Sequence, residues 1–175
     1  PMITFVEEIQ TYKAVIKEEQ GKLGVKEAKI GIMVEVPSAA VMANIFAGYV
    51  DFMSLGTNDL TQYVLAIDRG SCGLSAKADT LTPAVLKLIY NTCEAGKNAG
   101  IPVGLCGAAA SDIQAVPLLI GLGLRSLSVS GALIAEVKHL IRSLDVEACR
   151  AAALKALNMA EAKEVRAMLK ETFKL

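Results

Sequence analysis

Residues 29–36 read KIGIMVEV, and residues 51–59 read DFMSLGTND. Each stretch begins with a short apolar run and ends in polar or turn-forming residues, the pattern of a buried β-strand that enters a loop. Similar apolar runs recur twice further along the chain. The predicted strands are Lys29–Val34, Asp51–Leu55, Pro102–Cys106 and Leu127–Val129, and Pro1–Thr4 is expected to be the end of one more.

Each predicted strand is followed by a turn and a segment with helical periodicity, and several of these segments begin with Pro or Asp and end near Gly. Alternation of apolar strands and helices predicts an α/β fold with a parallel sheet covered on both faces, either doubly wound or closed into a barrel. The predicted helices are Glu7–Gln20, Ala39–Ala47, Pro83–Asn98, Asp112–Ile120 and Ala132–Ser143, and Asp145–Leu175 is predicted to form one or two surface helices with a break near Asn158.

The position of the polar residues favours the barrel. Glu35, the pair Asn58 and Asp59, Cys106 and Ser130 each come at or just after the carboxyl end of a predicted strand. In a (β/α)8 TIM barrel this edge carries the active site. Four or five β/α units amount to roughly half of the eight strands that a closed barrel needs.

The composition restricts the class of protein. Of the 175 residues, 53% are hydrophobic, and 18 basic residues balance 18 acidic ones, so nothing favours binding to nucleic acid or to an anionic membrane. The four cysteines form no CxxC pair, and no apolar stretch is long enough to cross a bilayer. We expect a soluble cytoplasmic protein, and the start at Pro1 suggests a fragment.

Glu35 and Asp59 follow neighbouring predicted strands, so the sequence presents two carboxylates to one edge of the sheet. Mg2+ prefers oxygen ligands and is often held by one or two carboxylates together with water and a substrate oxygen. The pair therefore indicates a Mg2+ site. Periodicity alone is as consistent with two surface acids, or with Asp59 capping the helix that follows.

Three further side chains can carry chemistry. Asn58 can donate its amide to a phosphate or carboxylate oxygen, and Arg69 can supply a bidentate cation for the same anion, although an isolated arginine is usually a solvated surface group. Cys106 can serve as acid or nucleophile, but buried structural cysteines are the commoner case, and we assign that role to Cys72, Cys93 and Cys149. His139, the only histidine, lies in a predicted amphipathic helix and is interpreted as structural.

Several segments together resemble the C-terminal domain of Enzyme I, the phosphoenolpyruvate-protein phosphotransferase of the bacterial sugar phosphotransferase system. They occur in family order within about residues 1 to 143. The resembling segments are Gly31–Ala39, Ser54–Tyr63, Ala66–Gly70, Leu81–Leu86, Val103–Gly107, Pro117–Gly123 and Leu127–Ser130.

The resemblance implies the C-terminal half of a phosphoenolpyruvate-binding (β/α)8 barrel over residues 1–143 and a helical extension over 144–175. In that family a histidine on a separate N-terminal domain takes the phosphoryl group of phosphoenolpyruvate (PEP), leaving pyruvate enolate, and passes it to the carrier protein HPr. By motif, Glu35 and Asp59 are implied to hold Mg2+, Asn58, Asp59 and Arg69 to bind the substrate, and Cys106 to protonate the enolate.

This sequence departs from the family pattern at three places. Ala108–Ala110 follow the Cys-Gly pair where many relatives carry an acidic residue, and Thr82 stands where a histidine often precedes the proline. Residues 74–79 look more like the Enzyme I modules of multiphosphoryl transfer proteins, in which Enzyme I is fused to HPr and a fructose-type domain. Both the stand-alone and the fused parent therefore stay open.

The resemblance also implies parts that these residues do not supply, among them the phosphohistidine domain, the HPr-binding helices and the first barrel strands. We expect the chain by itself to be inactive in phosphotransfer. Because a half barrel exposes strand edges and apolar surface, we expect it to self-associate, as a homodimer, or to pack against other material. The alternatives are another enzyme of PEP or pyruvate enolate, such as pyruvate phosphate dikinase or a citrate-lyase-like aldolase, and a non-catalytic dimerisation fragment.

Overall fold

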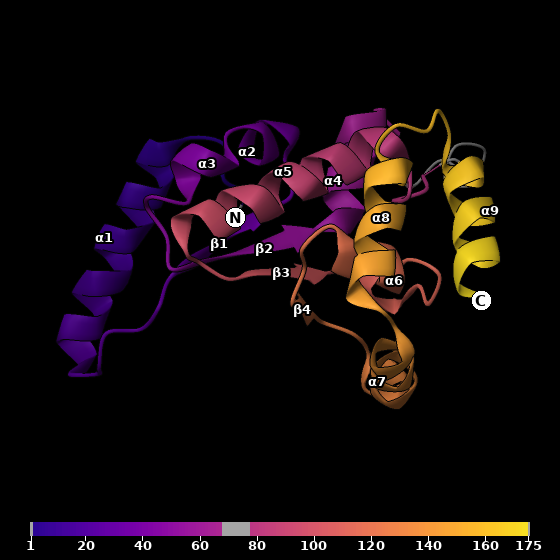
Figure 1. Ribbon diagram of the computed structural model, residues 1–175. Coiled ribbons are helices and arrows are strands. Elements are labelled where there is room, and N and C mark those ends of the chain that lie inside the picture. Colours follow the sequence, from indigo (N-terminus) through magenta and orange to yellow (C-terminus); the bar gives the residue numbers. More distant parts are fainter. Residues whose placement is uncertain (1, 68–77, 175) are drawn as a thin grey trace.

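The computed structural model describes residues 2–67 and 78–174 (Figure 1). Within these residues four parallel strands form one sheet in the order β1-β2-β3-β4. All four overlap the predicted strands, and the α/β class is confirmed as an alternation of parallel strands and helices consistent with a partial (β/α) barrel. The strands are β1 (Gly31–Val34), β2 (Phe52–Gly56), β3 (Val103–Cys106) and β4 (Ser126–Leu127).

Helices connect the strands and extend beyond the last one. The longest, α1 and α5, end where Gly24 and Gly100 adopt the left-handed conformation, with φ of 63° and 70°, which glycine reaches without a steric penalty. The helices are α1 (Val6–Leu23), α2 (Pro37–Val41), α3 (Ala43–Phe46), α4 (Thr57–Leu65), α5 (Pro83–Ala99), α6 (Val116–Gly121), α7 (Ile134–Ser143), α8 (Val146–Ala156) and α9 (Ala162–Phe173), with the 3-10 turns η2 (Ala108–Ser111) and η3 (Gly131–Leu133).

The two faces of the sheet differ in burial within the described part of the chain. One face packs beneath α2, α3 and α5 (Figure 1) and its residues are buried: Ile32, Val34, Met53, Leu55, Val103 and Leu105. The opposite face is only half-buried in the described part of the chain and carries Met33, Ser54, Gly104 and Cys106. In a closed barrel the face away from the helices is the interior. Cys106 therefore lies on the side that a barrel turns inward.

The predicted helix Ala39–Ala47 is two short helices, α2 and α3, that meet at Met42. Asn91, on α5, donates its side-chain amide to the carbonyl oxygens of Ala40 and Val41. Because a side chain satisfies carbonyl groups at the end of α2, the helical hydrogen-bond ladder can stop there without a penalty. A contact from α5, some 50 residues away, thus ends the helix.

Two further predicted boundaries are wrong. The helix expected from Asp112 begins at Val116, because the Asp112 side chain accepts from the Gln114 amide at 3.0 Å and its carbonyl accepts from Ala115, which makes a turn instead. The strand expected at Pro1–Thr4 is absent from the described residues 2–4. Glu8 accepts there from the Thr4 amide at 2.7 Å, which ties that amide to the start of α1 rather than to a sheet.

The C-terminal segment forms two helices, with the predicted break near Asn158 falling between α8 and α9. They are not purely surface helices. Both bury a face, with Cys149, Ala153 and Ala156 on α8 and Val165 and Leu169 on α9 fully buried. Helix α8 packs on α6 where Gly121 leaves no room for a side chain: an added methyl group would overlap the Cys149 carbonyl and lie 2.9 Å from Ala153 Cβ.

Candidate active site

The carboxyl ends of β1, β2 and β3 lie side by side at one edge of the sheet. Val34 pairs with Leu55, and Gly56 pairs with Cys106, so the three strands end at nearly the same level. Glu35 is the first residue after β1, and α4 begins directly after β2. The parallel register therefore brings the predicted site residues of three separate segments to one edge, as the sequence predicts.

The Glu35 side chain lies over Gly56. A methyl group added to Gly56 would be 2.9 Å from Glu35 Cβ, 3.1 Å from Glu35 Oε2 and 3.1 Å from Met33 Sδ. Gly56 has φ of −94°, so its backbone does not itself require glycine. The absence of a side chain there is what lets the Glu35 carboxylate lie against the end of β2.

The Cys106 thiol is half-buried on the inward face of the sheet. Its Sγ lies 3.5 Å from the Leu55 carbonyl oxygen and 3.7 Å from Met33 Sδ, and Ser54 Oγ lies 4.0 Å from it. Ser54 Oγ is the donor in its contact, whereas the Leu55 oxygen and Met33 Sδ are acceptors. A thiol has one hydrogen and is a weak donor, so it can point to only one of these two acceptors at a time. The sulfur therefore lies close to the same Met33 and Gly56 that border Glu35, and it is only half-buried.

The start of α4 is interlocked with the end of β3. Thr57 Oγ1 donates to the Cys106 carbonyl at 3.0 Å, and Asn58 Oδ1 accepts from the Ala108 amide at 2.9 Å. Gly107 makes this approach possible: its φ is 103°, and a side chain there would come within 2.8 Å of Thr57 Oγ1. Because the Asn58 oxygen already accepts a hydrogen bond, its NH2 group is the donor that it can offer to an anion.

Asp59 is in the first turn of α4 and is half-buried. Its position and that of Glu35 place two carboxylates after neighbouring strands at the same edge, which fits a cation that takes oxygen ligands. In the described part of the chain no three His, Cys, Asp or Glu side chains form a metal-binding group, so a cation here would depend on two carboxylates and outside ligands. Arg69, the predicted anion ligand, lies outside the described residues.

Three residues interpreted as structural, Cys93, His139 and Cys149, are on the helices α5, α7 and α8. Cys93 and Cys149 are buried, and burial is the main cause that raises the pKa of both thiols, that of Cys93 to about 12. Cys72 lies outside the described residues. His139 is on α7 but is exposed rather than packed in the core.

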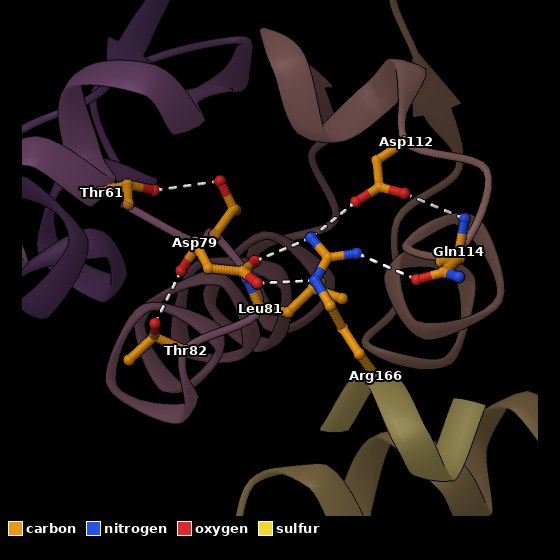
Figure 2. Close-up of polar contacts among 8 residues, drawn as sticks. Thr61, Asp79, Leu81, Thr82, Asp112, Gln114 and Arg166 are labelled. Carbon is orange, nitrogen blue, oxygen red and sulfur yellow. Dashed lines mark hydrogen bonds and ion pairs between the residues drawn. The ribbon is translucent and has the colours of Figure 1, made fainter. Parts of the chain in front are cut away.

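One polar cluster was not predicted from the sequence. Arg166 of α9 lies between Asp79 and Asp112 (Figure 2), which come from the stretch before α5 and from the stretch after η2. Sequence periodicity placed Arg166 on an unremarkable surface helix. The signal that could have found the cluster is an aspartate just before a helix in each of the two loops that flank the site.

Comparison with known proteins identifies the family of the chain. The family described as PEP-utilising enzyme, PEP-binding domain, matches residues 1–146. The chain belongs to this PEP-binding family. It is 41% identical to the phosphoenolpyruvate-protein phosphotransferase of Mycoplasma pneumoniae over 99% of the chain and 31% of that protein. It is also 42% identical to the protein of that name from Bacillus subtilis, over 99% of the chain and 32% of that protein.

A relative with a different name matches equally well. The multiphosphoryl transfer protein of Rhodobacter capsulatus is 45% identical over 96% of the chain and 20% of that protein. The chain is thus homologous to Enzyme I and to multiphosphoryl transfer proteins over nearly its whole length, but it spans about a third or less of these relatives. Within residues 2–67 and 78–174, none of the helices has the length and apolar content that a bilayer crossing requires.

Proposed function

We propose that the chain supplies the carboxyl edge of the PEP site in a cytoplasmic Enzyme I-type phosphotransferase. The observation that carries this is the convergence of Glu35, the start of α4 and Cys106 at one edge, within a chain that matches the PEP-binding family. The relatives include a phosphoenolpyruvate-protein phosphotransferase and a multiphosphoryl transfer protein, so the proposal covers both kinds of parent.

Glu35 and Asp59 would hold Mg2+ in this proposal, because both are carboxylates at the same edge and hard cations prefer oxygen. When bound, Mg2+ supplies positive charge that stabilises the phosphoryl and enolate oxygens. Asn58 and Arg69 would bind the phosphate and carboxylate oxygens, with the Asn58 amide held in place by the bond that its oxygen makes to Ala108.

Cys106 would protonate the enolate. As the P–O bond of PEP breaks, the phosphoryl group passes to a histidine outside this chain, and the electron pair of the enolate takes the thiol hydrogen at its methylene carbon to give the methyl group of pyruvate. The thiolate then regains a proton from water. The half-buried thiol on the inward face supports this role, since a donor must reach the substrate.

The partners follow the proposal. PEP and pyruvate are the small molecules, HPr is the acceptor through a separate phosphohistidine domain, and the parent is a homodimer. The division into a half barrel, 1–143, and a helical extension, 144–175, belongs to the same proposal.

Ligand binding can be tested on the 175-residue chain. We expect Mg2+ together with PEP to raise its Tm, because a ligand that binds the folded state stabilises it, by about 2.7 kcal/mol at a hundredfold excess over Kd. Glu35→Gln should abolish the shift. Glu136→Gln, which changes an exposed acid on α7, is the matched control and should keep it. No shift in the unmodified chain would contradict binding by these residues alone.

The proton-transfer role has a separate test that needs no phosphohistidine. With Mg2+ in D2O, we expect the chain to exchange the methyl hydrogens of pyruvate, followed by proton NMR, because the protonation step also runs in reverse. Cys106→Ala should lose the exchange, whereas Cys93→Ala, which alters a buried thiol on α5, should keep it. Exchange that persists in Cys106→Ala would remove Cys106 from the reaction.

A further inference from the structure

Arg166 joins the C-terminal helix α9 to two loops (Figure 2). Its Nε donates to Asp79 Oδ2 at 2.6 Å and its Nη2 donates to Asp79 Oδ1 at 2.9 Å, so the guanidinium holds this carboxylate with two bonds. Nη2 also donates to Asp112 Oδ2 at 2.9 Å, and Nη1 donates to Gln114 Oε1 at 3.1 Å. A planar fork of this kind fixes direction as well as distance, which a lysine cannot do.

The cluster is partly buried and contains one more negative charge than positive. The side chains of Arg166, Asp79 and Asp112 are 34%, 22% and 30% exposed. Partial burial by itself would raise the pKa of Asp79, but the Arg166 hydrogen bonds, the Leu81 amide and the Arg166 charge outweigh it and hold that pKa below its ordinary value. Without Arg166 the two carboxylates would have no cation between them, and like charges repel.

The Asp112 side of the cluster leads to the proposed PEP site. Asp112 directly follows η2, and η2 begins with Ala108, whose amide donates to Asn58 Oδ1 at 2.9 Å. The η2 segment is therefore held at one end by Asn58 and at the other by Arg166. Only the four residues of η2 separate Asp112 from the Asn58 contact, so a displacement of Asp112 can move the Ala108 amide.

The Asp79 side of the cluster contacts α4, the helix that carries Asn58. Thr80, the next residue, shares a hydrogen bond of 3.1 Å between hydroxyl groups with Thr61 of α4, and Asp79 Oδ1 accepts from the Leu81 amide at 2.9 Å. Between the two loops lies a hollow of about 310 Å3 that Asp79, Ala108, Asp112 and Arg166 help to line. Both loops that Arg166 holds thus also touch α4, the helix that begins with Thr57-Asn58-Asp59.

We propose that Arg166 is a positioning residue of the PEP site, which sets the place of Asn58 by holding the η2 segment and the approach to α5 in a fixed relation to α4. The inference rests on the proposed function, and it extends the site to α9, beyond residue 146 where the family match ends. Removing a group that orients the ligands of a metal site typically costs about 10- to 100-fold in affinity or activity, and we expect an effect at the lower end of that range here.

The test combines ligand affinity with hydrogen exchange in the 175-residue chain. Calorimetry measures the Kd for PEP in the presence of Mg2+, and NMR measures exchange of the Ala108 amide, whose hydrogen bond goes to Asn58 and not to Arg166. Arg166→Met keeps most of the side-chain length without the charge, and Arg166→Lys keeps the charge without the fork. Val165→Ala, a buried position on the same helix, is the control that weakens α9 packing without changing the cluster.

We expect Arg166→Met to raise the Kd by about 10-fold or more and to speed Ala108 exchange by a similar factor, Arg166→Lys to have a smaller effect, and Val165→Ala to lower Tm with both readouts unchanged. Unchanged Ala108 exchange in Arg166→Met, or equal changes in Val165→Ala, would overturn the inference. If Arg166→Met does not fold, exchange of the Ala108 amide in Asp112→Asn and Arg166→Lys provides the test instead.

The two proposals can fail separately. If the unmodified chain does not bind PEP with Mg2+, the proposed function fails for these residues, while Ala108 exchange still decides whether Arg166 positions the η2 segment. If the chain binds PEP and the Arg166 variants bind it equally well, the positioning role fails and the proposed function stands.

Discussion

Gly56→Ala should weaken Mg2+ and PEP binding. The new methyl group would lie 2.9 Å from Glu35 Cβ, whereas carbon atoms in contact prefer about 3.5 Å or more, so Glu35 must move by about 0.6 Å. Binding sites usually tolerate displacements of about 0.5 Å. We therefore expect roughly a 10-fold weaker Kd, equivalent to about 1.4 kcal/mol.

Alanine adopts a φ of −94° freely, so the Gly56 backbone does not oppose the change. Turning the Glu35 side chain does not move its Cβ, so the contact is relieved by a small shift of the chain after β1, and we expect a modest fall in Tm as well. Gly104→Ala, on the neighbouring strand, is the matched control, since its methyl group would meet Ser126 at an ordinary 3.5 Å. Calorimetry with PEP and Mg2+ measures both variants. A Kd for Gly56→Ala within 2-fold of the unmodified chain, or equal losses in the two variants, would refute the placement of Glu35 in the site.

Three further outcomes are expected from the same structure. In urea unfolding, Gly121→Ala should lower the free energy of unfolding by about 1–3 kcal/mol, because its methyl group meets the α8 backbone. Gly21→Ala, in open space on α1, should raise it by up to about 1 kcal/mol. A change in the same direction for both variants would contradict the α6–α8 contact. The lowered pKa of Asp79 stabilises the folded chain above the ordinary carboxyl pKa near 4, and this contribution is lost as the pH falls through the pKa of the folded state. Asp79→Asn should therefore lower the free energy of unfolding at pH 7 by less than about 2 kcal/mol and make that free energy fall less steeply between pH 7 and pH 3. The same pH dependence in the variant and the unmodified chain would count against the ion pair. Iodoacetamide at pH 8 should modify Cys106 well before Cys93, whose burial raises its pKa to about 12, and peptide mapping that finds equal rates would show that Cys93 is not buried.

The strands could be predicted because their signal is local. Each is a run of apolar residues ended by turn chemistry, and the parallel register then follows from the alternation with helices. The same local signal located Glu35, Asn58, Asp59 and Cys106 at strand ends, and the structure brings the segments that carry them to one edge. It could not show which sheet face is half-open, because that depends on the helices that pack on the other face.

Helix boundaries were predicted less well because distant side chains decide them. Asn91 ends α2 from another helix, and Glu8 ties up the amide of Thr4 that a strand would have needed. A window of neighbouring residues contains none of this information. At Asp112 the signal is local, because an aspartate can either cap a helix or begin a turn. Its bonds to the Gln114 amide and to Arg166 of α9 favour the turn.

The C-terminal helices show the limit most clearly. Their alanine-rich sequence looks like a surface helix because alanine carries little hydrophobic signal, yet small residues are what allow α8 to approach Gly121 of α6 so closely. Docking of α8 and α9 in turn brings Arg166 to partners 87 and 54 residues away in the sequence. Arg166 reaches the two loops only because α8 and α9 pack in this way, so periodicity alone could not have found it. Comparing Arg166→Met with Val165→Ala separates the effect of its polar contacts from the effect of α9 packing.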